Sequence, residues 1–541
     1  MNNYKVKKTM PAQDKGDRVL RLWLFQGFAV MNTNKIKAFM LAASVLFLLA
    51  CGEQQSSDTA DTGPAALTVV ETMLVNMGGL ASLRNIDSIV MTGNGTRNRL
   101  GQIPITGGID PDARLSGVTE TIDFVSGHAA FDNDVVVGDG FSQHRTEALT
   151  TWQGQKIGWG TTEGRPNIAT TVNGLFSWAT QNTPEMLLRR NPVSIAIAAE
   201  KVAPGQTARQ LSFAGRPHWA IDTMLNSEQV TIMIDQDTGL LGGFRALDTE
   251  TMLGDVDAEY RYSDYRPVGE VMLPFRHEII KDGQPYSSMN YSEIRINDPS
   301  AQAVFTVPED VRQQADQAAA EEAWAPLQWN RVSETVFHVV AFSHHSMVVE
   351  FPDFVAIIEG PYTEAQSMTL ERLIEDNIGK PIRYVIPTHP HYDHTGGLRA
   401  LAAAGASVLI AAGHEDEIRA IIESPHSNPP DVLALRVAAG VEVGQVELFS
   451  GMTEISNGGQ SLYLYEVETI PHVNPKVLAF VEADGILFQS DLFFGGPGPD
   501  ATALFNALQE LELEVTQIVG GHGGILPYTS LLEANAATTN N

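Results

Sequence analysis

The stretch that decides the fold of the second half of the chain is Thr388-His389-Pro390-His391-Tyr392-Asp393-His394-Thr395-Gly396-Gly397. It places three imidazoles and one carboxylate within six residues, and these are the ligands that zinc-like divalent metals prefer. On an extended segment His389 and His391 point the same way, whereas Asp393 and His394 turn toward a second position. A histidine-rich surface loop is the alternative. The density and spacing of the donors instead favour a loop that supplies two adjacent metal positions.

The residues around this loop predict strands that alternate with helices. Thr363 and Gln366 form a capping box ahead of apolar residues at helical spacing, and Gly379 ends that helix. We expect helices at 363–378 and 397–404, and strands at 333–340, 346–351, 354–359, 382–386, 407–410, 462–470, 477–482, 486–489 and 518–519. This alternation predicts an α/β arrangement, with the donor loop at the end of a strand.

The donor cluster and its flanks resemble the signature of the metallo-β-lactamase-fold hydrolases, the superfamily that includes glyoxalase II. The resemblance rests on the pattern H-x-H-x-D-H followed by Thr-Gly-Gly, and it covers about 332–532. It implies an αβ/βα sandwich for residues 328–541. The expected fold class of the whole chain is α+β, with an N-terminal antiparallel β-rich domain ahead of this C-terminal sandwich.

In that superfamily a lone histidine, an aspartate and a final histidine follow the signature in a fixed order. This chain supplies His472, Asp491 and His522 in that order, each after an expected strand. By resemblance, the metal ligands are His389, His391 and His472 for one cation, Asp393, His394 and His522 for the other, and Asp491 as the bridge. The bridging aspartate is similar to that of glyoxalase II, and the thiolate ligand of one β-lactamase subclass has no counterpart here.

The resemblance implies two zinc ions per chain and a hydrolytic reaction on a small-molecule substrate. Hydroxide held between the metals would attack an ester, lactone, amide or related bond, with Asp393 and Asp491 as the catalytic groups that orient it and move its proton. An iron-dependent, dioxygenase-like oxidoreductase on the same fold is one alternative, and a non-catalytic lipid-binding envelope lipoprotein is another. His391 favours zinc over the diiron relatives, which carry Glu there. The residues after His472 depart from those of thioester and lactone hydrolases, so the substrate stays open.

Other polar residues near these strands are expected to have lesser roles. Glu359 occupies the place where many relatives carry an aspartate that braces the ligand loop, so a bracing role is expected for it. His344 and His345 precede a strand and are expected at the surface or at the rim of the pocket. His414 and His426 are expected to be exposed to solvent.

Length and composition indicate how many domains the chain forms and which class of partner its charge disfavours. The chain has 541 residues, which indicates two or three domains. Hydrophobic residues make up 43%, enough for packed cores. The formal net charge is -30, and a strongly acidic surface repels phosphates, so nucleic acid is not expected as a partner.

The N-terminal region resembles a bacterial lipoprotein signal. Lys35 and Lys37 precede an apolar run at 38–50, which ends in Leu48-Leu49-Ala50-Cys51. The run is shorter than the roughly 20 residues that span a bilayer, which argues against a transmembrane anchor. Cys51, the single cysteine of the chain, would then carry the lipid.

This resemblance implies an address in the cell envelope. Residues 1–50 are expected to be an upstream extension followed by the signal peptide, with Met31 as a natural start. Residues 51–64 are polar and small and predict a flexible tether. Gly52 after the cysteine favours the outer membrane, with the protein facing the periplasm and attached to the membrane through its lipid.

Residues 65–312 predict an antiparallel β-rich domain with few helices. A helix is expected from Ala66, broken at Gly78-Gly79, and another near 184–202. Short β-like runs separated by turn signals such as Asp282-Gly283 fill the rest. The closing segment 262–308 is similar to that of LolA-like lipoprotein carriers, which implies either a scaffold or a lipid-binding sheet.

Two further features of the first half complete the expectations from sequence. An Ala-, Gln- and Glu-rich segment predicts a helical linker at 313–327. His144, His218 and His277 are isolated from one another in the sequence and are expected to be structural or surface residues.

Overall fold

The computed structural model describes residues 63–539 except 99–112, 138–140, 163–167, 172–183, 226–227, 251, 322–326, 342–343, 361–362, 429 and 469–472. All described residues belong to one compact unit, Thr62–Asn541. The expected signal peptide, Cys51 and nearly all of the tether lie outside the described residues. No helix in the described part of the chain has the length and apolar character needed to cross a membrane.

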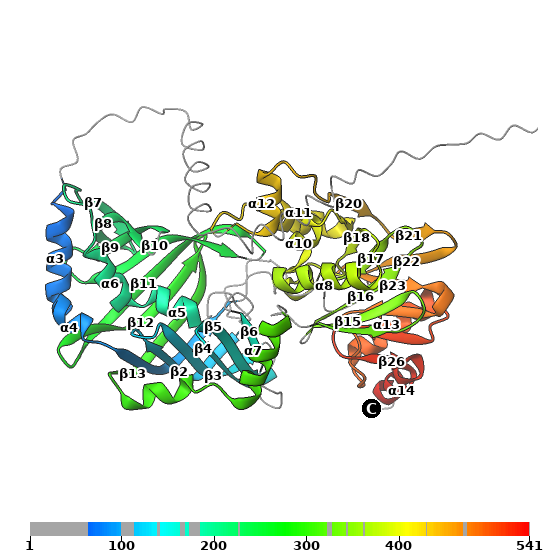
Figure 1. The fold of residues 1–541 in the computed structure, drawn as a ribbon, viewed down its shortest axis with the longest axis horizontal. Helices are drawn as coiled ribbons and strands as arrows, with labels where there is room; N and C mark the ends of the chain where they lie inside the picture. The colour runs from blue at the N-terminus through cyan, green and yellow to red at the C-terminus, as the bar shows by residue number, and fades with distance from the viewer. Residues whose placement is uncertain are drawn as a thin grey trace, which may run out of the picture. The chain divides into compact units, whose positions relative to one another are not determined.

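The N-terminal part of the described chain is built on one antiparallel sheet of 13 strands (Figure 1). The strands are β1 Ser88–Arg97, β2 Ala113–Asp123, β3 His128–Val137, β4 Phe141–Trp152, β5 Gln155–Thr162, β6 Ile168–Thr171, β7 Arg209–Phe213, β8 Arg216–Leu225, β9 Glu228–Asp235, β10 Leu241–Glu250, β11 Gly254–Val268, β12 Val271–Lys281 and β13 Gln284–Ile296. The chain starts at β1 in mid-sheet, runs out to β6 at one edge, and returns from β7 at the other edge to β13, which pairs with β1. The β-rich N-terminal region expected from the sequence is confirmed.

Turns and helices of this part follow the local sequence signals. Asp282 and Gly283, both with positive φ, join β12 to β13 in a two-residue turn of the kind that suits a hairpin. The helices are α3 Ala66–Asn76, α4 Leu80–Arg84, α5 Pro184–Arg190 and α6 Pro192–Ala199. The single helix expected near 184–202 is two helices, because the Asn191 side chain accepts from the Val193 amide and caps α6 before Pro192. Residues of α3 and α6 are buried in one core with the sheet.

The segment that follows the sheet contains the 3-10 helix η3, Pro299–Phe305, and the helix α7, Glu309–Glu321. Val311 and Ala315 of α7 pack in a small apolar cluster with Ile157 of β5. Asp316 of α7 accepts a hydrogen bond from the indole of Trp152 at 2.7 Å. The helix expected near 313–327 therefore starts earlier and packs on the sheet, while the domain boundaries placed there stay a prediction.

The C-terminal part contains two sheets that lie face to face. The first has seven strands in the order β14 Gln328–Arg331, β15 Val336–Val340, β16 His345–Glu350, β17 Val355–Ile358, β18 Ile382–Ile386, β19 Ser407–Ala411 and β20 Val446–Phe449. The second has six, in the order β21 Met452–Asn457, β22 Gln460–Val467, β23 Lys476–Val481, β24 Ile486–Gln489, β25 Gln517–Gly520 and β26 Ile525–Pro527. Side chains of both sheets share one buried core.

Helices cover the outer face of each sheet (Figure 1). They are α8 Glu364–Asn377, α9 Tyr392–Thr395, α10 Leu398–Ala403, α11 Glu415–Glu423, α12 Val432–Ala438, α13 Pro499–Glu510 and α14 Tyr528–Thr539, with short 3-10 turns η4 Ala412–His414 and η5 Glu482–Asp484. In β23, Val477 and Ala479 face the core between the sheets, whereas Leu478 and Phe480 pack with α13 and α14. This alternation buries the strand on both faces, and the four-layer order confirms the αβ/βα sandwich.

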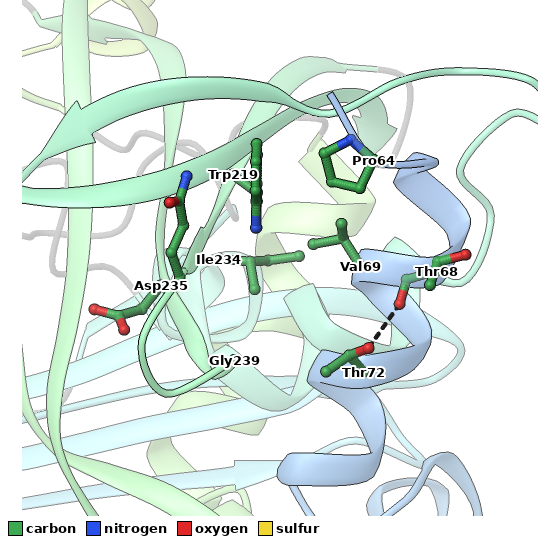
Figure 2. A pocket seen from close by; sticks show the side chains of 9 residues that line it. Pro64, Thr68, Val69, Thr72, Trp219, Ile234, Asp235 and Gly239 are labelled. Atoms are coloured by element: carbon green, nitrogen blue, oxygen red, sulfur yellow. Dashed lines mark hydrogen bonds between the residues drawn. The ribbon is translucent and has the colours of Figure 1, made fainter. Parts of the chain in front are cut away.

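The N-terminal part also has a cavity of about 290 Å³ between α3 and the strands β8 and β9. Figure 2 shows Val69, Trp219 and Ile234 around it, with the Thr72 hydroxyl donating to the Thr68 carbonyl at 2.8 Å. Asp235 at its wall is engaged by the Thr238 amide at 2.8 Å and holds the β9–β10 turn. These polar groups thus bond within helix α3 or within the β9–β10 turn.

Candidate metal centre

The expected donor loop follows β18 and continues into the single-turn helix α9. Its four candidate donors are all buried: His389, His391, Asp393 and His394. The loop is tied down by Thr395, whose hydroxyl donates to the His391 carbonyl at 2.8 Å. Thr388 Oγ1 lies 2.9 Å from Nδ1 of His389, so the Nε2 atom of that ring faces the centre.

Asp491 lies in the middle of the expected donors. It follows β24 and has a backbone φ of 63°, a conformation that is uncommon for residues other than glycine and is concentrated at functional sites. Its Oδ2 lies 3.0 Å from His389 Nε2 and 3.1 Å from His394 Nε2, and its Oδ1 lies 2.8 Å from His522 Nε2. Imidazoles from two distant loops therefore converge on one carboxylate.

The second carboxylate, Asp393, is approached mainly at one oxygen. Its Oδ2 lies 3.3 Å from His394 Nε2 and 3.6 Å from His522 Nε2. The same oxygen lies 2.7 Å from Nε2 of His344, a residue that was expected at the rim. Three imidazole nitrogens thus surround a single carboxylate oxygen.

These contacts divide into groups in which one ligand-type atom from each member lies within 4.8 Å of the others. The groups are His389–His391–Asp491, His394–Asp491–His522, His344–Asp393–His522 and Glu359–His389–His394. Asp491 belongs to two of them, as do His389, His394 and His522, so the groups share members and form one continuous cluster. Six of the seven expected ligands therefore lie together. His472 falls in the range 469–472, outside the described residues, and its role as a ligand stays a prediction.

Positively charged and imidazole side chains shift the pKa values of the buried carboxyls in the cluster. Burial works against the ionised carboxyl of Asp491, but His394 and Lys476 outweigh it and hold its pKa well below the usual value. In the same way His394 and His344 hold the pKa of Asp393 well below its usual value. Burial also opposes protonation of His522, yet its hydrogen bonds to the two aspartates raise its pKa to about 9.

The donor set is suited to divalent cations. Buried carboxylates that attract this much positive charge, surrounded by imidazole nitrogens, are the environment in which zinc-like ions are held. Lys476 is fully buried and places its Nζ 3.1 Å from Asp491 Oδ2, which supplies one fixed positive charge. Burial lowers the pKa of His389 well below its usual value and that of His344 to about 4, so these imidazoles stay neutral and bound cations would supply the remaining positive charge.

A comparison with protein families agrees with this geometry. Residues 339–507 match the family model described as the Metallo-beta-lactamase superfamily. The C-terminal part of the chain carries a metallo-β-lactamase superfamily domain. A search of the curated proteins found no match.

Solved structures similar to this metallo-β-lactamase domain come from several bacteria. A metallo-beta-lactamase from Pontibacter korlensis is 19% identical, and the match covers 40% of this chain and 100% of that one, with a TM-score of 0.32. One from Hirschia baltica is 16% identical over 39% and 98% of the two chains, with a TM-score of 0.30. The mono-zinc form of FIM-1 from Pseudomonas aeruginosa is 18% identical over 40% and 95%, also with a TM-score of 0.30.

Glu359 contacts the donor loop of the metallo-β-lactamase domain from the end of β17. Its Oε1 accepts a hydrogen bond from Thr388 Oγ1 at 2.5 Å, and its Oε2 lies 2.9 Å from His394 Nδ1. Its backbone φ is 68°, again in the left-handed region. Two carboxylates of the centre, Glu359 and Asp491, therefore occupy unusual backbone conformations just after parallel strands.

Four histidines differ from their expected places, and one of them, His345, is buried at the start of β16. His344 is 2% exposed and belongs to the donor cluster instead of the rim. His414 is buried, with Nε2 2.6 Å from the Pro475 carbonyl, and His426 is buried 3.7 Å from Asp431. The burial of these histidines could not be predicted from their position next to expected strands. It depends on contacts with residues that the folded chain brings close to them.

Met252, in the turn between β10 and β11, also reaches the metallo-β-lactamase domain. It is buried in the same apolar core as Leu398 and Leu401 of α10. Its Sδ lies 3.3 Å from Oγ1 of Thr395, the residue that follows His394. A turn of the N-terminal sheet thus contacts the segment that carries the donors.

Proposed function

We propose that the chain is a metal-dependent hydrolase. Its expected ligands would hold two divalent cations, zinc by the chemistry of the donors, at His389, His391 and His472 on one side and at Asp393, His394 and His522 on the other, with Asp491 between them. The observation that carries the proposal is the position of Asp491, within 2.8 to 3.1 Å of nitrogens of His389, His394 and His522. Binding to the same pair of cations would explain why residues this distant in the sequence meet around one buried carboxylate.

The chemistry would combine the metals with the residues around them. Bound cations supply Lewis acidity and lower the pKa of a coordinated water from 15.7 toward about 7. The carboxylate oxygens of Asp393 and Asp491 can accept hydrogen bonds from the attacking water and so orient it. Glu359 and Thr388 keep the rings of His394 and His389 turned inward. The sequence has no Gly-x-Ser-x-Gly nucleophile elbow, which supports direct hydrolysis of an ester, lactone, amide or related bond.

The test combines metal analysis with activity. Protein purified without added metal is assayed for zinc and iron, and the zinc-loaded protein is screened against lactones, thioesters, β-lactams, sulfate esters and phosphoesters. We expect two equivalents of metal and turnover of at least one class. His391→Ala and Asp393→Ala should lower kcat by orders of magnitude, whereas His218→Gln, which alters a buried histidine of β8 outside the donor groups, should not. Wild-type turnover by either donor variant would contradict the proposal.

We also propose that the protein is attached to the outer membrane of a bacterium and faces the periplasm. The support is the sequence Leu48-Leu49-Ala50-Cys51 after a basic and then an apolar segment. Expression with a radiolabelled fatty acid should label the wild-type protein and leave Cys51→Ser unlabelled. Equal labelling of both proteins would refute attachment at Cys51.

A further inference from the structure

His344 joins the donor cluster from a loop that precedes the expected ligands by more than forty residues. It lies just before β16, and its ring is almost wholly shielded from solvent. Its ring centroid is 4.1 Å from that of His522 and 5.7 Å from that of His394, at steep interplanar angles of 74° and 69°. The ring of His344 thus packs edge to face against both histidines, and the Nε2 atoms of all three rings lie within 3.6 Å of Asp393 Oδ2.

The backbone holds His344 in this place. The amide of His345 donates to the Gly521 carbonyl at 2.7 Å, which ties the start of β16 to the loop that carries His522. His338 of β15 adds a second tie, because its Nε2 lies 3.1 Å from the Gly520 carbonyl. The loops of His344 and His522 are therefore fixed side by side, independently of the contact between their rings.

Asp393 Oδ2 lies among three imidazole nitrogens. Nε2 atoms of three histidines approach this oxygen, His344 at 2.7 Å, His394 at 3.3 Å and His522 at 3.6 Å. Nε2 of His394 and of His522 also contacts Asp491, whereas His344 approaches the centre from the Asp393 side. A hydrogen bond joins only one of these nitrogens to the oxygen through one proton, but a cation among the four atoms would accept a lone pair from each of them.

We propose that His344 is an eighth ligand of the metal centre, which binds through Nε2 the cation held by Asp393 and His522. This inference rests on the metal centre proposed above. Nε2 of His344 lies 2.7 Å from Oδ2 of Asp393. This distance is close to the 2.8 Å between Nε2 of His522 and Oδ1 of Asp491, two residues that are expected to bind one cation. The second cation position would thus contain three imidazoles, from His344, His394 and His522.

The test is a cobalt titration of the full chain, followed by visible absorption, which depends on the number and type of ligands. His344→Gln keeps an N–H donor for Asp393 but removes the imidazole, so it separates ligation from hydrogen bonding. We expect it to alter the spectrum of one cobalt equivalent and to lower its affinity by more than about 100-fold, beyond the loss typical of a residue that only supports a ligand. His218→Gln, a change at a buried histidine of β8 outside the donor groups, should titrate like the wild type.

Two outcomes overturn the inference. One is a wild-type spectrum for both cobalt equivalents in His344→Gln. The other is a loss of affinity below about 100-fold, as expected for a residue that only supports a ligand, without a change in the spectrum. His391→Ala in the same titration distinguishes the failures. If His391→Ala also binds two equivalents of cobalt normally, the proposed metal centre is wrong. If it loses metal, the metal centre stands and only the proposed role of His344 is wrong.

A crystal structure of the metal-loaded wild type gives a measurement that needs no variant to fold. His344 Nε2 at about 2.1 Å from a cation, the usual zinc–nitrogen distance, would support ligation. A ring that contacts only Asp393 would overturn it.

Discussion

The Oε2 atom of Glu359 lies 2.9 Å from Nδ1 of His394, on the side of the ring opposite the centre. This contact leaves Nε2 of His394 directed at Asp393 and Asp491. Space for it depends on Gly521, where a Cβ atom would lie 2.7 Å from Glu359 Oε2. Glu359 therefore selects both the orientation and the tautomer in which His394 can act as a ligand.

Replacing Glu359 with Gln should weaken metal binding without dismantling the site. The amide oxygen of Gln can still accept a hydrogen bond from His394, but the negative charge that would make His394 a stronger metal ligand is lost. Such changes typically lower metal affinity by about 10- to 100-fold. Competition with a chromophoric chelator measures the affinity. Glu350→Gln is the matched control, because Glu350 ends the neighbouring strand β16 and pairs with Lys380 instead. Equal affinities of Glu359→Gln and the wild type would remove Glu359 from the centre.

Lys476→Met should destabilise the metal-free protein more than the metal-loaded protein. Its buried ammonium offsets the charge of Asp491 at 3.1 Å, and removing one partner of a buried pair costs about 3 kcal/mol or more. Bound cations would supply the missing positive charge. Thermal unfolding with chelator and with zinc measures both states. Lys380→Met, which breaks a half-exposed pair with Glu350, should cost less than about 1 kcal/mol in either state. Equal losses of stability with and without zinc would contradict this role for Lys476.

The sequence was sufficient to place the donor loop because its candidate donors lie close together in the chain and its flanking strands and helices follow simple periodicities. Thr388 to His394 could be placed at a strand end before any tertiary contact was known. His344 and Met252 could not, since their positions depend on which strands and turns become neighbours in space. The backbone pairing of His345 with Gly521 and the burial of Met252 beside Thr395 are visible only in the folded chain.

Met252→Ala should destabilise the metallo-β-lactamase domain although the residue belongs to the N-terminal sheet. Met252 is 7% exposed and fills space beside Leu398 and Thr395, and truncation of a buried Met to Ala costs about 2 kcal/mol or more. Leu253→Ala is the control, because this neighbour in the same turn is 37% exposed and should change stability by less than about 0.5 kcal/mol. The loss is measured by urea unfolding. Equal stabilities of the two variants would show that the turn does not support the domain.

His277 on β12 should make the protein less stable in acid. Its ring lies edge-on between Tyr262 and Tyr291, and burial, with Arg190 adding to it, lowers its pKa to about 3. An unfolded histidine titrates near about 6.5, so between these values the unfolded chain binds a proton that the folded chain does not. The stabilising contribution of the neutral ring is therefore complete above the higher value and is lost as the pH falls toward the lower one. Urea unfolding at pH 7 and pH 5 should show a loss about 2 kcal/mol larger for the wild type than for His277→Phe, which cannot titrate. If His277→Phe also follows the wild type, the buried ring does not determine the acid sensitivity.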